Sequence, residues 1–152
     1  MGSIPNTTTF SLLDVKNLLG CPFDQNSCFI YSVNSYFDPT YKGSKNSLMN
    51  FRNYTEPFIS VNNTYGIFHY NRGILYGANN CTVSLGPSWA GYTYTYSWTT
   101  GTYFSYSKSG DTFTISCNSD NYGSIRTDTL TFHLSSGGLT ATFTATQFTS
   151  PN

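Results

Sequence analysis

The sequence predicts a mainly β protein, an immunoglobulin-like antiparallel β-sandwich that follows a short α-helical N-terminal module. Three observations predict this fold class. Apolar residues follow a helical period near the N-terminus, but from about Glu56 they alternate with polar residues, as in strands. Turn residues separate the alternating runs, and a chain of 152 residues has room for one sandwich and a small appended module. We therefore expect a helical anchoring module at residues 1–56 and the sandwich at residues 57–152.

Two short helices are expected in the N-terminal module. The first spans residues 11–20, where a serine N-cap, a C-terminal glycine and an apolar face fit a helix of about two to three turns. The second runs from about Asn26 to Tyr36 and ends before Pro39, because the residue that precedes a proline disfavours helical geometry. Its apolar stripe draws on Cys28, Phe29, Tyr31, Val33 and Tyr36. Residues 37–54 are rich in turns, with one further helical turn.

The strands of the sandwich are expected wherever apolar and Ser/Thr residues alternate. The clearest runs are residues 92–98, 112–117, 129–134 and 140–146. Shorter runs place earlier strands at Phe58–Val61, Gly66–Tyr70 and Cys81–Leu85. Several short strands with turn residues between them are typical of a sandwich.

The composition restricts the classes of partner. Charged residues make up 9% of the chain, whereas a soluble domain usually has about 25%. Ser, Thr, Asn and Tyr must therefore supply the polar surface, which favours packing within an assembly. Seven basic and seven acidic residues give a formal net charge of zero, so no general field attracts phosphate backbones or anionic lipid. No stretch approaches the ~18 apolar residues of a membrane span. We expect neither nucleic acid nor a membrane as partner.

The four cysteines are predicted to be reduced, mostly buried thiols. They are Cys21, Cys28, Cys81 and Cys117. The first ten residues lack the basic and apolar regions of a secretion signal, so we expect the product to stay where it is made. Disulfides are rare in a reducing compartment. The cysteine spacings also match no zinc motif, and we expect neither a metal site nor a cofactor.

Catalytic residues are not predicted. Hydrolysis by carboxylates needs two acids that face each other across a cleft, but the acids here lie mainly at expected caps, turns and strand starts. His69 and His133 fit ordinary strand positions. No Gly-x-Ser-x-Gly, phosphate-loop or dinucleotide motif is present. We interpret the protein as a non-enzyme.

An aromatic run occupies one face of a predicted strand, and it has two interpretations. It consists of Tyr92, Tyr94, Tyr96 and Trp98. If the face points inward, three tyrosine hydroxyls are buried and need hydrogen-bond partners. If it points outward, the rings form a contact surface, mainly for subunit packing and less for stacking on glycans.

The C-terminal part resembles a known family. The segments Gly110–Cys117, Ser124–Leu134 and Gly138–Gln147 look like the last strands of Bacteroidetes immunoglobulin-like domains of the BACON type. In that pattern a strand begins with Arg, here Arg126, and after a Gly-containing hairpin the terminal strand closes on Gln, here Gln147. The resemblance implies the immunoglobulin-like fold, and such modules occur both in glycan-binding proteins and in phage virions.

The N-terminal part carries a second resemblance. Thr9–Asp14 and Phe37–Tyr54 are similar to a module of structural proteins of Bacteroidetes phages, including crAss-like phages, that precedes variable β-rich domains. The resemblance implies an anchor that carries an exposed domain. It assigns contact with a neighbouring virion protein to Phe37, Asp38, Tyr41, Phe51, Arg52 and Tyr54. The alternative interpretation of residues 51–54 is a linker packed against the sandwich.

Two functions are expected from these observations. The first is a virion structural protein of a tailed phage, of an auxiliary capsid, head-decoration or head-fibre type. It would be made in the host cytoplasm, form homo-oligomers, and contact major capsid, fibre or tail proteins. The second is a carbohydrate-binding module that adheres to host or gut glycans through Tyr92–Trp98.

Overall fold

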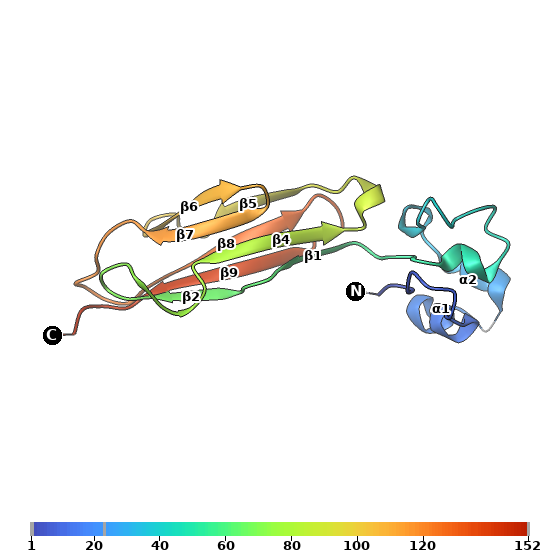
Figure 1. Ribbon diagram of the computed structural model, residues 1–152, viewed down its shortest axis with the longest axis horizontal. Coiled ribbons are helices and arrows are strands. Elements are labelled where there is room, and N and C mark those ends of the chain that lie inside the picture. Colours follow the sequence, from blue (N-terminus) through green and yellow to red (C-terminus); the bar gives the residue numbers. More distant parts are fainter. Residues whose placement is uncertain (1, 23, 152) are drawn as a thin grey trace. The chain divides into compact units, whose positions relative to one another are not determined.

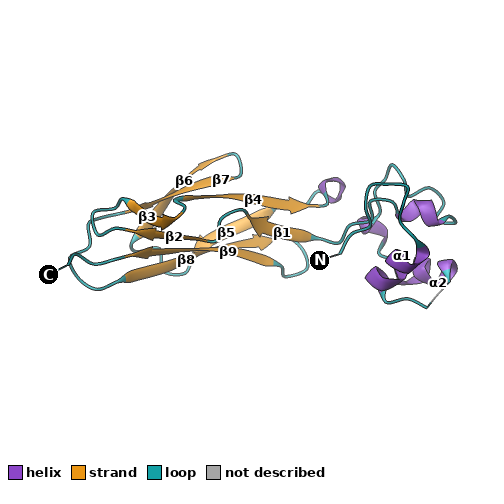
Figure 2. Ribbon diagram, turned by 60° about the horizontal axis from the view of Figure 1, so that its bottom comes forward, coloured by secondary structure: helices purple, strands orange, loops and turns teal. Residues whose placement is uncertain are grey.

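The computed structural model describes residues 2–22 and 24–151, and the chain divides into two compact units. The helical unit comprises Met1–Phe58 together with Gly86–Tyr92, and the sandwich unit comprises Ile59–Leu85 and Thr93–Asn152. Figure 2 shows the helices in the first unit and the main run of strands in the second. The predicted fold class, a mainly β sandwich with short helices, is confirmed.

The two α-helices of the helical unit begin and end at clear capping signals. The first, α1 (Leu12–Leu19), has a capping box between Ser11 and Asp14 and ends at Gly20, which adopts the left-handed conformation at φ 65°. The second, α2 (Gln25–Tyr31), is capped by Asp24 and ends five residues earlier than predicted. Short 3₁₀ turns follow at Asn34–Tyr36, Leu48–Phe51 and Ser88–Ala90.

The early end of α2 has a visible cause. The hydroxyl of Ser32 donates a 2.6 Å hydrogen bond to the carbonyl of Phe29, inside the last turn of the helix. The amide of Val33 then donates to the phenol oxygen of Tyr54 at 2.8 Å instead of continuing the helical ladder. A tertiary hydrogen bond thus overrides a helical pattern that the local sequence supports.

The helical unit has its own hydrophobic core. Its buried members are Ile4, Phe10, Val15, Cys21, Cys28, Phe37, Phe51 and Tyr54. The ring of Phe37 lies 5.0 Å from that of Phe51 and 4.8 Å from that of Tyr54, measured between centroids. The three rings therefore fold the unit around one aromatic cluster.

Two sheets form the sandwich (Figure 1). The four-stranded sheet has the order β1 (Phe58–Val61), β4 (Asn80–Gly86), β7 (Thr112–Cys117) and β6 (Phe104–Ser109). The five-stranded sheet has the order β3 (Ile74–Gly77), β2 (Tyr65–Phe68), β9 (Thr140–Gln147), β8 (Arg126–Leu134) and β5 (Tyr94–Trp98). If β1 and β2 are taken as two halves of the first strand, this order corresponds to the ABED and CFG sheets of immunoglobulin domains, with β3 as an additional edge strand.

The five-stranded sheet is mixed, which the expectation of an antiparallel sandwich did not include. Strand β2 runs parallel to β9, with Tyr65 opposite Thr144. The cause lies in the connection that precedes it, because β1 pairs in the other sheet and the chain crosses to this one before Tyr65. The pairs β2–β3, β4–β7, β5–β8, β6–β7 and β8–β9 are antiparallel.

Two strands, β3 and β6, were not predicted. All four residues of β3 are exposed, and in β6 every residue after Phe104 is exposed. Both strands lie at the edge of a sheet. Without a buried face, neither strand has to carry an apolar side chain at every second position, so the pattern that predicts the other strands is weak there.

The two cysteines of the sandwich are buried, and within the described residues they remain free thiols, as predicted. Cys81 lies opposite Phe113 and Cys117 lies opposite Phe104 on neighbouring strands. Because Phe113 and Cys117 are four residues apart on β7, the two thiols stand about 13 Å apart along the strands, too far for a disulfide. Burial raises the pKa of each thiol to about 11.

Buried polar side chains fix one end of the sandwich. Gln147 is fully buried, and its amide nitrogen donates to the carbonyls of Tyr70 at 3.0 Å and Ser119 at 2.9 Å. Its amide oxygen accepts a 3.4 Å hydrogen bond from Arg126, the first residue of β8. The Arg and Gln of the predicted strand pattern therefore meet across β8 and β9, where they are register partners.

Asp128 plays a similar part in the loop that follows β5. Its carboxylate is 3% exposed and accepts hydrogen bonds from the amides of Thr100 and Gly101 and from the hydroxyl of Thr100. Burial raises the pKa of this carboxyl, but the hydrogen bonds outweigh burial and the net shift is downward. The loop after β5 is thus closed by a buried carboxylate.

Candidate functional site

The predicted docking residues are mostly interior residues of the helical unit. Phe37, Phe51 and Tyr54 are each 1% exposed or less. Burial also raises the pKa of Tyr54 to about 12. These three rings cannot be surface contacts while the unit is folded, so their role in docking can only be indirect, through the shape of the unit.

Asp38 is also buried and serves the local fold. Its carboxylate accepts hydrogen bonds from the side-chain amide of Asn53 at 2.8 Å and from the backbone amide of Thr40 at 2.9 Å. Burial raises the pKa of this carboxyl, but these hydrogen bonds outweigh it and lower the pKa overall. The carboxylate therefore closes the turn that begins the Phe37–Tyr54 segment.

Tyr41 and Arg52 are the two predicted docking residues that reach the surface. The guanidinium carbon of Arg52 lies 4.2 Å from the centroid of the Tyr41 ring, in a cation–π contact. The Nε of Arg52 donates a 2.8 Å hydrogen bond to the side-chain oxygen of Asn6. The guanidinium has further donors beyond this bond, so the Tyr41–Arg52 pair can still contribute to a polar contact.

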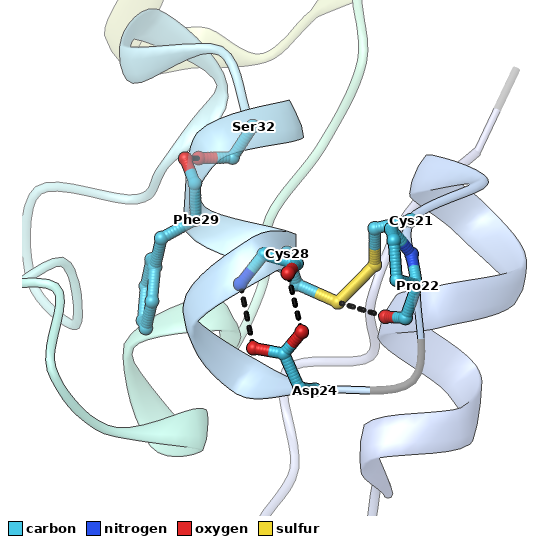
Figure 3. Close-up of a disulfide and its surroundings, with 7 residues drawn as sticks. Cys21, Pro22, Asp24, Cys28, Phe29 and Ser32 are labelled. Atoms are coloured by element: carbon cyan, nitrogen blue, oxygen red, sulfur yellow. Dashed lines mark hydrogen bonds between the residues drawn. A yellow bond between two sulfur atoms is a disulfide. The ribbon is translucent and has the colours of Figure 1, made fainter.

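A disulfide joins Cys21 to Cys28 (Figure 3), and it corrects the prediction that all four cysteines are reduced. Gly20 turns the chain directly after α1, and α2 begins four residues after Cys21, so the two Cα atoms lie 5.2 Å apart. This separation is within the range that disulfides adopt. The prediction failed because it rested on the expected compartment, and the proximity of the two thiols depends on the packing of the helices.

An exposed apolar surface lies at the end of α2 and was missed by the sequence analysis. Ile30 is 82% exposed, Tyr31 is 55% exposed and Val33 is 43% exposed. The disulfide turns Cys28 inward, and a residue two positions later points to nearly the opposite side of a helix. We call Ile30, Tyr31 and Val33 the α2 surface. The predicted stripe had placed Tyr31 and Val33 on the inner face, because it assumed a helix that continued to Tyr36.

The aromatic run is neither fully buried in the core nor fully exposed as a contact surface, the two positions that were predicted for it. Tyr94, Tyr96 and Trp98 are half-buried between the edges of the two sheets. The rings of Tyr94 and Tyr96 lie 6.4 Å and 4.8 Å from that of Phe113, and Trp98 stacks on Phe104 at 6.0 Å. They thus close the side of the sandwich where β5 and β6 are the edge strands.

One tyrosine hydroxyl of this run has the partner that an inward position requires. The hydroxyl of Tyr94 donates a 2.8 Å hydrogen bond to Asp111, and burial together with this bond raises the pKa of Tyr94 well above its ordinary value. The ring of Tyr96 meets that of Tyr106 edge-on, with 5.4 Å between the centroids. Tyr92 belongs to the helical unit, whereas the other three residues belong to the sandwich unit.

Neither the comparisons with known proteins nor the arrangement of possible metal ligands adds a further site in the described residues. No protein-family model matches the chain, and neither a curated protein nor a solved structure matches it. Among residues 2–22 and 24–151, no three His, Cys, Asp or Glu side chains are grouped so that they could hold a metal ion. None of the described helices is long and apolar enough to cross a membrane.

Proposed function

We propose that the chain is a non-enzymatic structural protein of a tailed-phage virion, of a head-decoration or head-fibre type. In this proposal the helical unit docks on a neighbouring virion protein, and the immunoglobulin-like sandwich is the presented domain. The observation that supports docking is the α2 surface. Ile30 is 82% exposed although the helical unit has a hydrophobic core of its own, so this side chain is available to a partner. The assignment to a virion comes from the resemblance of Phe37–Tyr54 to phage structural proteins.

The α2 surface defines how strong such docking can be. Complete burial of a large apolar side chain contributes about 1.5–3 kcal/mol. Association of two proteins costs about 4–15 kcal/mol in lost translational and rotational freedom. The three residues of the α2 surface are already partly buried, so the free energy gained by burying the rest of them can be smaller than this cost. A single copy would therefore dock weakly through these residues alone. Several copies that bind together, as in a symmetric particle, would overcome this limit, and we propose a homo-oligomer for that reason.

The buried rings of the Phe37–Tyr54 segment have a defined part in this proposal. They build the core against which α2 packs, since Phe29 of α2 lies 4.6 Å from Phe51 between ring centroids. Residues with this role are constrained by packing and not by direct contact with a partner. The resemblance in this segment then reflects a shared helical unit whose outer surface carries the docking residues.

The test uses particles of the phage or prophage that encodes this chain. We expect the wild-type polypeptide in purified particles, and we expect Ile30→Glu to remove it, because a carboxylate would be buried in the docking interface without a partner. Tyr122→Glu is the matched control, since Tyr122 is 73% exposed on the sandwich. Particles without the wild-type chain, or with Ile30→Glu at the wild-type copy number, would contradict the proposal.

The carbohydrate-binding alternative stays a prediction. The ring contacts of Tyr94, Tyr96 and Trp98 lie within the sandwich, and nothing about their geometry favours a sugar as the ligand. Glycan-array binding by the wild-type chain that disappears in Trp98→Ala would support this alternative. Absence of binding at millimolar sugar would count against it.

A further inference from the structure

Strand β3 is an open edge of the five-stranded sheet. In the described part of the chain it pairs with β2 on one side and with no strand on the other. Its three large side chains are exposed, at 47% for Ile74, 38% for Leu75 and 62% for Tyr76. Natural edge strands usually carry a charge or a proline that blocks pairing with another chain. Among the edge strands of the described residues, β6 has Lys108 in this role, whereas β1, β5 and β3 have neither kind of residue. Of these three, β3 is the strand in which every residue is exposed.

A pocket of about 250 Å³ adjoins this edge. The residues that line it are mainly apolar and aromatic, and they include Leu75 of β3. The lining residues are His69, Tyr70, Leu75, Phe148, Thr149, Ser150 and Pro151. The chain after β9 is held in place because the amide of Phe148 donates to the carbonyl of Phe68 and the amide of Ser150 donates to the carbonyl of Asn121, each at 2.9 Å. The pocket is therefore formed by hydrogen-bonded backbone.

We propose that the open edge of β3 and this pocket bind an extended, uncharged segment of a partner protein. The segment adds to the sheet as a strand beside β3 and places one apolar side chain in the pocket. This is the mode in which main-chain hydrogen bonds supply affinity and a pocket for a side chain supplies specificity. It concerns the sandwich unit and is independent of docking through the α2 surface.

The charges around the edge favour a neutral segment. Arg72, two residues before β3, forms an ion pair with Asp120, with a 2.8 Å separation between Nε and Oδ1. Each charge is thus already compensated by the other. The strand itself and the pocket residues Leu75, Phe148 and Pro151 carry no charge. A charged side chain on the incoming segment would lose hydration against these apolar walls. The buried Nδ1 of His69 at the pocket, which has no hydrogen-bond partner among the described residues, could offset only part of this loss.

The exposed area favours a single strand over a second copy of the chain. With ~200 Å² for a fully exposed large side chain, the three large residues of β3 offer about 300 Å². A stable interface between two proteins takes about 800 Å² from each partner. The area is therefore less than half of what a dimer needs, while an added strand relies on its backbone hydrogen bonds as well.

The test is a titration of the full chain with a fluorescein-labelled peptide, acetyl-Thr-Val-Thr-Phe-Thr-Val-Thr-amide, followed by fluorescence anisotropy. We expect saturable binding in the micromolar to millimolar range, and binding roughly tenfold weaker when Asp replaces the central Phe of the peptide. Leu75→Lys should weaken binding of the Phe peptide by a similar factor. The matched control, Ser107→Lys on the edge strand β6, should leave it unchanged. Leu75→Thr serves as a second variant that keeps a strand-forming residue, if Leu75→Lys reduces folding.

Amide chemical shifts locate the binding. Changes confined to residues 65–77 and 148–151 would support the proposal. It would be overturned if neither the Phe peptide nor its Leu and Trp versions bound at 2 mM, or if both Leu75 variants bound normally. Dimerisation in sedimentation velocity that Leu75→Lys abolishes would overturn the choice of occupant and assign the edge to a second copy. None of these outcomes bears on whether Ile30→Glu removes the chain from particles.

Discussion

Reduction of the Cys21–Cys28 disulfide should destabilise the helical unit and leave the sandwich unchanged. The bond links residues seven positions apart, so it closes a short loop. The chain-entropy relation for cross-linked loops gives about 2.5 kcal/mol at 25 °C for a loop of this length. A unit of about 65 residues has a total stability of only ~3–10 kcal/mol, so the loss removes a large fraction of it.

The two tryptophans allow this prediction to be measured separately in each unit. Trp89 belongs to the helical unit, where its indole nitrogen donates a 3.1 Å hydrogen bond to the carbonyl of Ser35. Trp98 lies in the sandwich. Fluorescence of the Trp98→Phe variant therefore reports urea unfolding of the helical unit, and fluorescence of Trp89→Phe reports unfolding of the sandwich.

With a urea dependence of about 1–1.5 kcal/mol per molar for a small unit, reduction should lower the Trp89 midpoint by about 2 M. The reductant has one target among the described residues, because Cys81 and Cys117 are already thiols. A Cys21→Ala/Cys28→Ala variant should be insensitive to it. A Trp89 midpoint that moves by less than about 0.5 M, or a Trp98 midpoint that moves equally, would refute the reasoning.

Three further predictions concern buried polar groups. Asp128→Ala should lower the free energy of unfolding of the sandwich by about 3 kcal/mol in urea titrations, because backbone donors lose a charged partner. Since the folded pKa of Asp128 lies below the ordinary value of 3.8, its contribution to stability is present above that value and is lost as pH falls through the folded pKa. The melting temperature of the wild type should therefore drop below about pH 4, and that of Asp128→Ala should drop less. Tyr54→Phe should cost the helical unit about 1–2 kcal/mol, read from Trp89 fluorescence, because the amide of Val33 loses its acceptor. Gln147→Leu should cost the sandwich about 2–3 kcal/mol in the same kind of titration, because two carbonyls and Arg126 lose their partner; an unchanged midpoint in any of these variants would contradict the assigned contact.

The strands with a buried face were predictable from the sequence. In β7 and β9 every second side chain is buried, and the alternation of apolar and Ser/Thr residues records this directly. The capped helix α1 was equally visible, since its serine and glycine signals are local. The open edge β3 was missed because an exposed strand places no demand on its side chains. Local sequence patterns thus predicted the elements that have a buried face or capping residues, and did not predict the exposed strand.

The candidate site was less predictable because its features depend on tertiary contacts. A run such as Phe37–Tyr54 is specific enough to suggest a function, but its three large rings turned out to be core. Sequence specificity alone does not separate a packing constraint from a contact surface. The exposure of Ile30 depends on where α2 ends, and that end depends on the bond between Val33 and Tyr54. No local signal encodes that bond.

The assignment of Gly86–Tyr92 to the helical unit limits how this protein can be divided. The chain leaves the helical unit at Phe58, completes β1 to β4, returns to the unit, and enters β5 afterwards. A gene fragment that starts after residue 58 would still encode this returning segment, and Trp89 would then lack the carbonyl of Ser35. Exchange of the presented domain between related genes would accordingly need three crossover points, at 58/59, 85/86 and 92/93. Each unit is compact in space, yet the segments that form the two units alternate along the gene.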